Sequence, residues 1–216
     1  MYSEHQPAGD LARWVECTWS IEAATPMYDF PVRPDGCMDL WYSPEEGLAV
    51  VGTMTRERRY DVASGVRWVG LRFLPGMARR YLGIGVAELL DQVVPLQEVI
   101  GRPGRELRAR LDCAPSNGER RQLLLDAVAS RTRPADPVHR AIAAMTQVHG
   151  DADVDWLADQ AGMSARQFRR RCREEAGVGP KQLARILPSV VPAGWPRMAR
   201  AGCASPPKPA TSTRHT

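Results

Sequence analysis

The spacing of apolar residues changes partway along the chain, and this change limits the folds available to it. Up to about residue 75, apolar side chains alternate with polar or small ones; in WVECTWSIE at 14–22, for example, the alternating residues are Val15, Cys17, Trp19 and Ile21. Alternation is typical of strands with one buried face. From residue 76 onward the spacing becomes helical, as in PGRELRARL at 103–111. We therefore predict an α+β fold in which a β-rich part precedes a helical part.

Turn and cap residues divide the chain further. Pro34-Asp35-Gly36 and Pro75-Gly76 are predicted turns, and RTRPADP at 131–137 interrupts the helical pattern, with Asp136 and Pro137 suited to start the next helix. Besides 14–22, strands are predicted at 37–42, 47–53 and 65–73, and helices at 76–83, 86–94, 103–111 and 118–130. The predicted organisation is a β-rich domain at 1–100, a helical connector at 101–135, a second domain at 136–187 and a disordered tail at 188–216.

Composition argues against several classes of protein. The sequence has no apolar run of the roughly 20 residues that a membrane span needs, and its first residues lack the order of a signal peptide, so we expect a cytoplasmic protein. The five cysteines are odd in number and contain no C-x-x-C pair, which predicts reduced thiols. The common nucleotide-binding and hydrolase motifs are absent and the four histidines are scattered. We therefore predict no catalytic residue, no metal and no cofactor.

The net charge of +4 does not by itself indicate a nucleic-acid partner. Residues 1–135 hold 17 Lys+Arg against 18 Asp+Glu, residues 136–187 hold 8 against 7, and residues 188–216 hold 4 against none. The excess therefore lies in the tail, and only a local concentration of charge can point to DNA.

One short segment has such a concentration. SARQFRRRCREE at 164–175 carries five arginines within eight positions. On a helical wheel Phe168 and Cys172 share a packing face, while the arginines occupy an adjacent arc. Ser164 suits an N-cap and Gly177 a helix end. The five are Arg166, Arg169, Arg170, Arg171 and Arg173.

The preceding residues predict a second, shorter helix. Apolar or small residues at 154, 157, 158 and 161 recur at helical spacing after Asp151 or Asp153 as cap, and Gly162-Met163-Ser164 then makes a tight turn, as in a helix-turn-helix. Arginine suits DNA because its guanidinium binds guanine edges and phosphates. The alternative is a solvated helix on which Glu174 and Glu175 pair with the arginines.

The same segment resembles a known family. VDWLADQAGMSARQFRRRCREEAGVGPKQLARIL at 154–187 is similar to the first helix-turn-helix of AraC-type (AraC/XylS) bacterial transcriptional regulators, with departures at Asp159, Phe168 and Cys172. The resemblance implies that Arg166, Arg169 and Arg170 read bases and that the flank around Lys181 approaches the DNA backbone. The predicted DNA-binding residues are Ser164, Arg166, Gln167, Arg169, Arg170, Arg173 and Lys181.

The N-terminal half also resembles part of these regulators. LARWVECTWSIE, VRPDGCMDLWY and VGLRFLPGMARRYLG are similar to the uncharacterised sensor-like domain that precedes AraC-type DNA-binding units. This resemblance covers about residues 8–100 and implies a β-rich, cupin-like barrel or sandwich with appended helices. The alternative for its tryptophans, aspartates and cysteine is a structural role in core and turns. The candidate ligand-binding residues are Trp19, Asp35, Cys37, Trp41 and Trp68.

The C-terminal end departs from the family pattern. AraC-type regulators carry two helix-turn-helix units joined by a long helix, whereas Pro188 breaks the helical pattern where that helix would begin. Residues 188–216 contain six prolines and no acidic residue, as expected of a G·C-rich gene read out of frame. We therefore expect a truncated or frameshifted regulator without its second unit.

These observations predict a cytoplasmic transcriptional regulator that binds double-stranded DNA, with a small-molecule effector or a second copy of the chain as partner of its N-terminal domain. The alternative is an interaction protein left by truncation, which binds effector or pairs with other chains but not with DNA. A third hypothesis is an alkyl-accepting repair enzyme centred on Cys37, for which the sequence lacks the zinc-binding cysteines that activate such a thiol.

Overall fold

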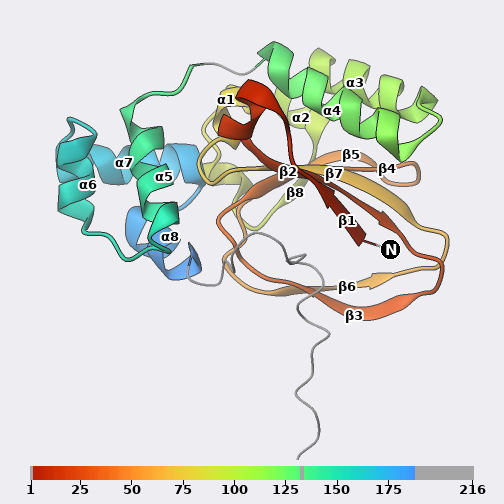
Figure 1. Ribbon diagram of the computed structural model, residues 1–216, viewed down its shortest axis with the longest axis horizontal. Helices are drawn as coiled ribbons and strands as arrows, with labels where there is room; N and C mark the ends of the chain where they lie inside the picture. Colours follow the sequence, from red (N-terminus) through yellow and green to blue (C-terminus); the bar gives the residue numbers. More distant parts are fainter. Residues whose placement is uncertain (1, 132–133, 188–216) are drawn as a thin grey trace, which may run out of the picture.

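The computed structural model describes residues 2–131 and 134–187. A β-rich N-terminal body (2–131) carries a smaller C-terminal bundle of helices (134–187) at one side (Figure 1). The α+β prediction is confirmed, and the predicted tail at 188–216 lies outside the described residues.

The strands are β1 (Tyr2–His5), β2 (Val15–Glu22), β3 (Met27–Val32), β4 (Met38–Ser43), β5 (Gly47–Val51), β6 (Arg58–Val62), β7 (Arg67–Phe73) and β8 (Val93–Pro95). The helices of the body are η1 (Gly9–Arg13), α1 (Ala78–Leu82), η2 (Ala87–Leu89), α2 (Leu96–Ile100), α3 (Arg102–Cys113) and α4 (Asn117–Arg131), and those of the bundle are α5 (Pro137–Gln147), α6 (Val154–Gln160), α7 (Ala165–Ala176) and α8 (Pro180–Ile186).

The strands form two antiparallel sheets of unequal size. The larger sheet has the order β1-β2-β7-β4-β5-β8, and β3 pairs with β6 in a second sheet. In Figure 1 the small sheet lies below the large one, and α2, α3 and α4 lie above it. The large sheet therefore has both faces covered, one by helices and one by strands. The implied likeness to a cupin stays a prediction.

Alternation along the central strands decides which side chains meet each layer. On β4, Leu40 and Tyr42 belong to the core under the helices, whereas Asp39 and Trp41 face the space between the sheets. The same alternation on β7 places Arg72 in that space. Successive strand residues point to opposite faces, so a period of two supplies both the core and a second, more polar surface.

Strand β2 departs from the predicted alternation. The pairing of β2 with β7 shifts register between Val15 and Cys17. Val15 therefore packs in the core under the helices, while Cys17, Trp19 and Ile21 pack against the small sheet. A β-bulge adds one residue to a strand and changes the face of the residues that follow. The prediction that all four share a face was wrong for Val15.

The helix predicted at 86–94 is also wrong. Only the short η2 forms, Asp91 adopts a φ of 56°, and the next residues pair with β5 as strand β8. The Asp91 carboxylate accepts hydrogen bonds from the Thr55 backbone N–H at 2.9 Å and from the Thr55 hydroxyl at 2.6 Å. Strand pairing and these bonds outweigh the helical pattern.

Helices α3 and α4, in the stretch predicted as a connector, pack on the large sheet. Leu107, Leu111, Leu124 and Val128 belong to the same buried core as the strands. These helices are therefore part of the N-terminal body.

Helix α5, the first helix of the C-terminal bundle, is capped by Asp136 as predicted. The Asp136 carboxylate accepts a hydrogen bond from the Val138 N–H at 3.0 Å, and Pro137 occupies the first turn of α5. The bundle has a core of its own, which includes Ile142, Leu157 and Phe168. Across 2–131 and 134–187, no helix is long and apolar enough to cross a membrane.

Candidate functional site

Helices α6 and α7, with the turn between them, lie where the helix-turn-helix is predicted. Helix α6 is capped by Asp153, which accepts a hydrogen bond from the Trp156 N–H at 2.7 Å. At the start of α7, Ser164 Oγ accepts from the Gln167 N–H at 3.3 Å, and Gln167 Oε1 accepts from the Ser164 N–H at 2.9 Å. Helix α7 ends before Gly177, whose φ is 80°. Such a capping box fixes where the helix begins, so Ser164 and Gln167 hold the start of the arginine helix.

Four of the five arginines of α7 are exposed, while Phe168 and Cys172 on the packing face are 0% exposed. Arg169 lies 3.6 Å from Asp155, and Arg170 lies 2.9 Å from Glu174. Exposed ion pairs contribute only about 0–1 kcal/mol, so a phosphate could replace either carboxylate. The other two exposed arginines, Arg166 and Arg173, have no ion-pair partner among the described residues.

The predicted DNA-binding residues fall on two sides of α7. Arg169 shares a surface depression with Lys181 of α8, which is exposed. Arg170 lies instead in a depression on the side that faces α1, together with Arg79 and Arg80. The structure therefore brings Arg169 and Lys181 together and places Arg170 beside the N-terminal body.

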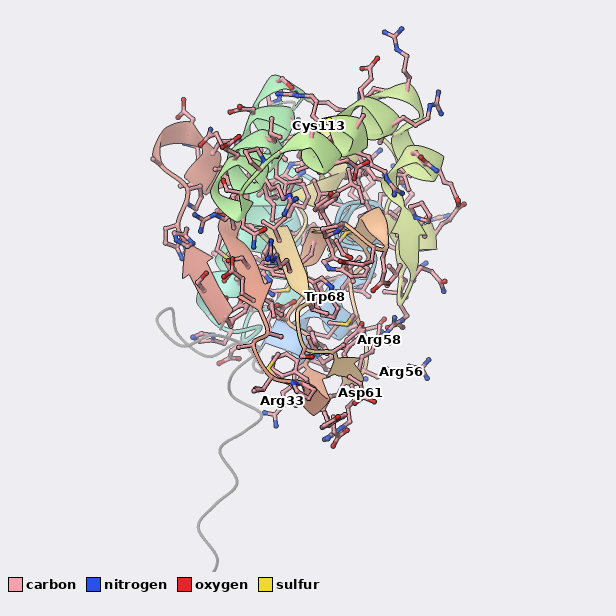
Figure 2. The ribbon with its side chains drawn as sticks, turned by 90° about the vertical axis from the view of Figure 1, so that its right-hand side faces the viewer. Arg33, Arg56, Arg58, Asp61, Trp68 and Cys113 are labelled. Carbon is pink, nitrogen blue, oxygen red and sulfur yellow. The ribbon has the colours of Figure 1, made fainter. Side chains whose placement is uncertain are left out.

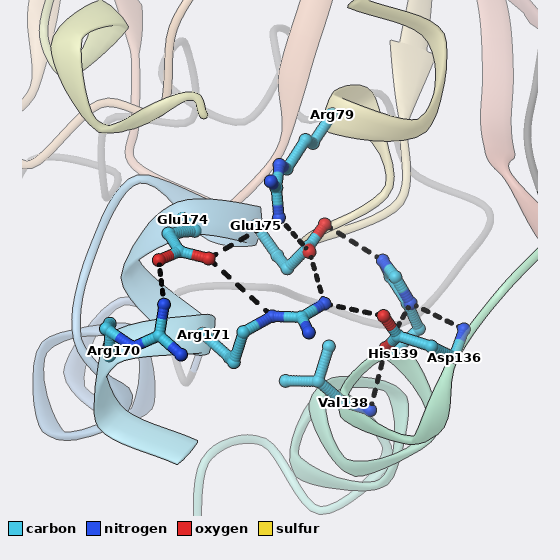
Figure 3. Close-up of polar contacts among 8 residues, drawn as sticks. All are labelled: Arg79, Asp136, Val138, His139, Arg170, Arg171, Glu174 and Glu175. Carbon is cyan, nitrogen blue, oxygen red and sulfur yellow. Dashed lines mark hydrogen bonds and ion pairs between the residues drawn. The ribbon is translucent and has the colours of Figure 1, made fainter. Parts of the chain in front are cut away.

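The fifth arginine, Arg171, belongs to a cluster around the buried side chains of His139 and Glu175, which we call the Glu175 network (Arg79, Asp136, His139, Arg171 and Glu175; Figure 3). The Glu175 carboxylate lies 2.5 Å from Arg79, 2.9 Å from Arg171 and 3.0 Å from His139 Nε2, and its side chain is 1% exposed. The Asp136 backbone N–H donates to His139 Nδ1 at 3.0 Å. Because Nδ1 accepts this bond, we assign the proton that Glu175 accepts to Nε2.

Glu175 is ionised in this setting although it is buried. Burial by itself raises the pKa of Glu175, but the bonds from His139 and Arg171 and the charge of Arg79 outweigh it and lower the pKa to about 2. The alternative interpretation of α7 is confirmed in its pairing, since Glu174 lies 2.9 Å from Arg170 and Glu175 lies 2.9 Å from Arg171, but it is wrong in placing Glu175 on a solvated face. The sequence already indicated that Glu175 is buried, because Glu175 follows Phe168 by seven residues and so lies on the packing face of the helix.

The N-terminal body caps the end of α7. The Thr53 hydroxyl, buried in the loop between β5 and β6, donates to the Ala176 carbonyl at 2.8 Å. The Val86 N–H donates to the Glu174 carbonyl at 3.0 Å. The last carbonyls of a helix have no partner within it, so these two bonds tie α7 to the N-terminal body. Sequence reasoning did not find these residues.

A second candidate site lies between the two sheets. A cavity of about 370 Å³ is lined by Trp19, Trp41 and Trp68, the three tryptophans predicted to bind a ligand. Asp35 and Cys37 are not among its lining residues. Asp35 Oδ1 accepts from the Cys37 N–H at 2.9 Å, and Cys37 is 5% exposed, so the structural interpretation fits these two residues better.

A buried arginine also lines this cavity. The Arg72 guanidinium, 4% exposed, lies 3.3 Å from Asp39, 3.5 Å from Glu4 and 3.7 Å from Asp35. Asp39 accepts a hydrogen bond from Trp19 Nε1 at 2.9 Å. Burial raises the pKa of Asp39 to about 6, against the opposing effect of Arg72. Three carboxylates already surround the positive charge of Arg72.

Close packing positions the aromatic wall. A Cβ atom on Gly70 would lie 2.2 Å from the Trp19 ring, so only glycine lets this indole lie across β7. Trp41 and Trp68 meet edge to face, with ring centroids 5.4 Å apart. Among the described residues, the buried Trp41 Nε1 has no hydrogen-bond acceptor.

Comparison with known families identifies one part of the chain. Residues 3–95 match a family described as Domain of unknown function (DUF6597), so the chain carries this domain at its N-terminus. The match runs from β1 to the end of β8 and therefore contains both sheets and the cavity, but not the helices that follow. A search of curated proteins found no match.

Proposed function

We propose that the protein is a cytoplasmic transcriptional regulator of the AraC type, which places α7 in the major groove of double-stranded DNA and binds a small-molecule effector in its N-terminal domain. The observation that carries the proposal is the exposed arginine face of a capped helix-turn-helix. Its sequence resembles the AraC-type pattern. The N-terminal match adds support, since DUF6597 is a domain found in AraC-type regulators.

The contacts at the end of α7 suggest how an effector would act on DNA binding. Met54 lines the cavity, and its neighbour Thr53 donates to the last turn of α7. A ligand that moves Met54 would therefore change how α7 is held. The ligand can change DNA affinity only as far as it binds one arrangement of Met54 and α7 more tightly than the other.

The described residues contain one predicted helix-turn-helix, at α6 and α7, and one such unit makes few phosphate contacts. We therefore expect a modest affinity for DNA that falls steeply with salt. Pairing of two chains through their N-terminal domains would raise the affinity, because the second unit then binds at a high effective concentration. We accordingly propose a homodimer as the DNA-binding form.

Fluorescence anisotropy with labelled DNA from upstream of the protein's own gene, at several salt concentrations, tests the proposal. Arg166→Ala/Arg170→Ala should abolish the preference for this DNA, because the resemblance assigns both side chains to base contacts and each such contact contributes about 1–3 kcal/mol of discrimination. The matched control is Arg105→Ala/Arg110→Ala, which removes the same charge from exposed positions of α3. The control should bind like the unaltered protein.

Weak binding that is the same for every DNA sequence and for all three proteins would contradict the proposal. That result would favour the alternative function, an interaction protein that binds effector or pairs with other chains. Analytical ultracentrifugation of the unaltered protein would then show whether it pairs.

A further inference from the structure

We propose that the cavity between the two sheets binds a small organic cation. The inference names the ligand class of the effector site and rests on the proposed function only for its regulatory meaning. Its basis is the combination of aromatic faces and surplus negative charge around one cavity.

Aromatic side chains form much of the cavity wall. The three tryptophans are joined there by Phe30 and Tyr60 of the small sheet. Because Trp41 and Trp68 meet at an interplanar angle of 84°, the wall presents ring faces in more than one direction. The face of an aromatic ring carries negative partial charge and attracts an ammonium group, most strongly where water is displaced.

The ionisable side chains of the wall carry a net negative charge. Asp39, Glu46 and Asp61 line the cavity together with one arginine, Arg72. Arg72 already lies within 3.7 Å of three carboxylates, so its charge is offset inside the protein. An anionic ligand would add to the negative surplus, whereas a cation would reduce it.

Arginines at the nearby edge of the small sheet do not reverse this balance. Figure 2 shows Arg33, Arg56 and Arg58 around Asp61 at this edge. Arg33 lies 3.2 Å from Glu57, and Arg58 donates to a backbone carbonyl. None of the three arginines is among the residues that line the cavity.

The volume of about 370 Å³ is within the usual range of about 300–1,000 Å³ for small-molecule sites.

Three probes of similar shape separate the effect of charge from that of size. They are choline, the uncharged 3,3-dimethylbutan-1-ol, in which carbon replaces the nitrogen, and the anion 3,3-dimethylbutanoate. Quenching of tryptophan fluorescence in the full chain, without DNA, gives the affinity of each.

Choline should bind about tenfold more tightly than the alcohol, because desolvated cation–π contacts contribute about 1–2 kcal/mol. The carboxylate should bind more weakly than either. Absence of choline binding, or equal or tighter binding of the alcohol or the carboxylate, would overturn the proposal.

Matched variants test whether the preference for choline arises at the cavity. Glu46→Gln/Asp61→Asn removes two exposed acidic groups at the cavity and should weaken choline binding about tenfold while leaving the alcohol unchanged. Glu98→Gln/Asp151→Asn removes the same charge from exposed positions outside the cavity and should change neither. Equal weakening by both pairs would mean that choline responds to overall charge and binds elsewhere.

A second pair of variants tests the aromatic wall. Trp68→Leu should lose most of the choline affinity and Trp68→Phe should retain more of it, with circular dichroism as the check on folding. Because DNA is absent, failure of this proposal leaves the arginine-helix proposal intact. Equally, loss of DNA binding would leave the choline result unaffected.

Discussion

Replacement of Glu175 by glutamine tests whether the Glu175 network stabilises the docked α7. In the folded chain the pKa of Glu175 falls from 4.5 to about 2, because the bonds from His139 and Arg171 outweigh burial. This lowering corresponds to about 3 kcal/mol of stabilisation at neutral pH. We therefore expect Glu175→Gln to lower the free energy of unfolding by about 3 kcal/mol, the range found when one partner of a buried ion pair is removed.

The loss should depend on pH in a defined direction. The folded-state pKa of Glu175 lies below the unfolded value, so its contribution is fully present above about pH 4.5 and disappears as the pH falls through about 2. The difference between the unaltered protein and Glu175→Gln should therefore shrink from about 3 kcal/mol at pH 7 to about half of that near pH 3.

Urea unfolding followed by circular dichroism at both pH values measures this difference. The matched control is Glu174→Gln, which removes the same charge from a neighbour whose side chain is 31% exposed. The control should cost less than Glu175→Gln, because Glu174 is only half-buried and its shortest ion pair, 2.9 Å long, is with the exposed Arg170. Equal losses in the two variants, or a difference that does not change with pH, would refute the reasoning.

Three further predictions concern the cavity wall and the end of α7. Gly70→Ala should displace the Trp19 ring, shift the tryptophan emission and cost about 1–3 kcal/mol in urea unfolding; an unchanged spectrum and midpoint would contradict the close packing. Thr53→Val keeps the shape of the side chain but removes the donor to the Ala176 carbonyl. The substitution should lower the free energy of unfolding by about 1–3 kcal/mol and speed amide exchange at the end of α7. Unchanged exchange would mean that the bond does not hold the helix. Asp39 should titrate near pH 6 as a step in tryptophan fluorescence, because burial raises its pKa. The ionised carboxylate should destabilise the fold, so the free energy of unfolding should fall as the pH rises through about 6. A fluorescence step that survives in Asp39→Asn would assign the titration to another group.

Sequence reasoning succeeded where the deciding interactions are local. The caps at Asp136 and Ser164 and the end of α7 at Gly177 depend on side-chain and backbone bonds within a few residues, so their residue types reveal them. The three tryptophans of the cavity were found because they lie on strands that the sequence also predicts.

Sequence reasoning failed where contacts between distant segments decide the structure. Arg79 and Glu175 are 96 positions apart, and Thr53 and Ala176 are 123 apart, so neither contact leaves a pattern in any short stretch. The bulge after Val15 and the strand that replaces the helix at 86–94 depend on pairing with β7 and β5. In both cases tertiary pairing overrides the local periodicity.

The capping of α7 by the N-terminal body bears on how such segments can be exchanged between proteins. A chimera that joined residues 136–187 to an unrelated sensing domain would leave the Glu174 and Ala176 carbonyls without the donors from Val86 and Thr53, and Glu175 without Arg79. Each unpaired buried group would cost about 1–3 kcal/mol, a large part of the stability of a small bundle. The transferable module is therefore the bundle together with α1, η2 and the loop between β5 and β6, and a cut at residue 136 would divide it.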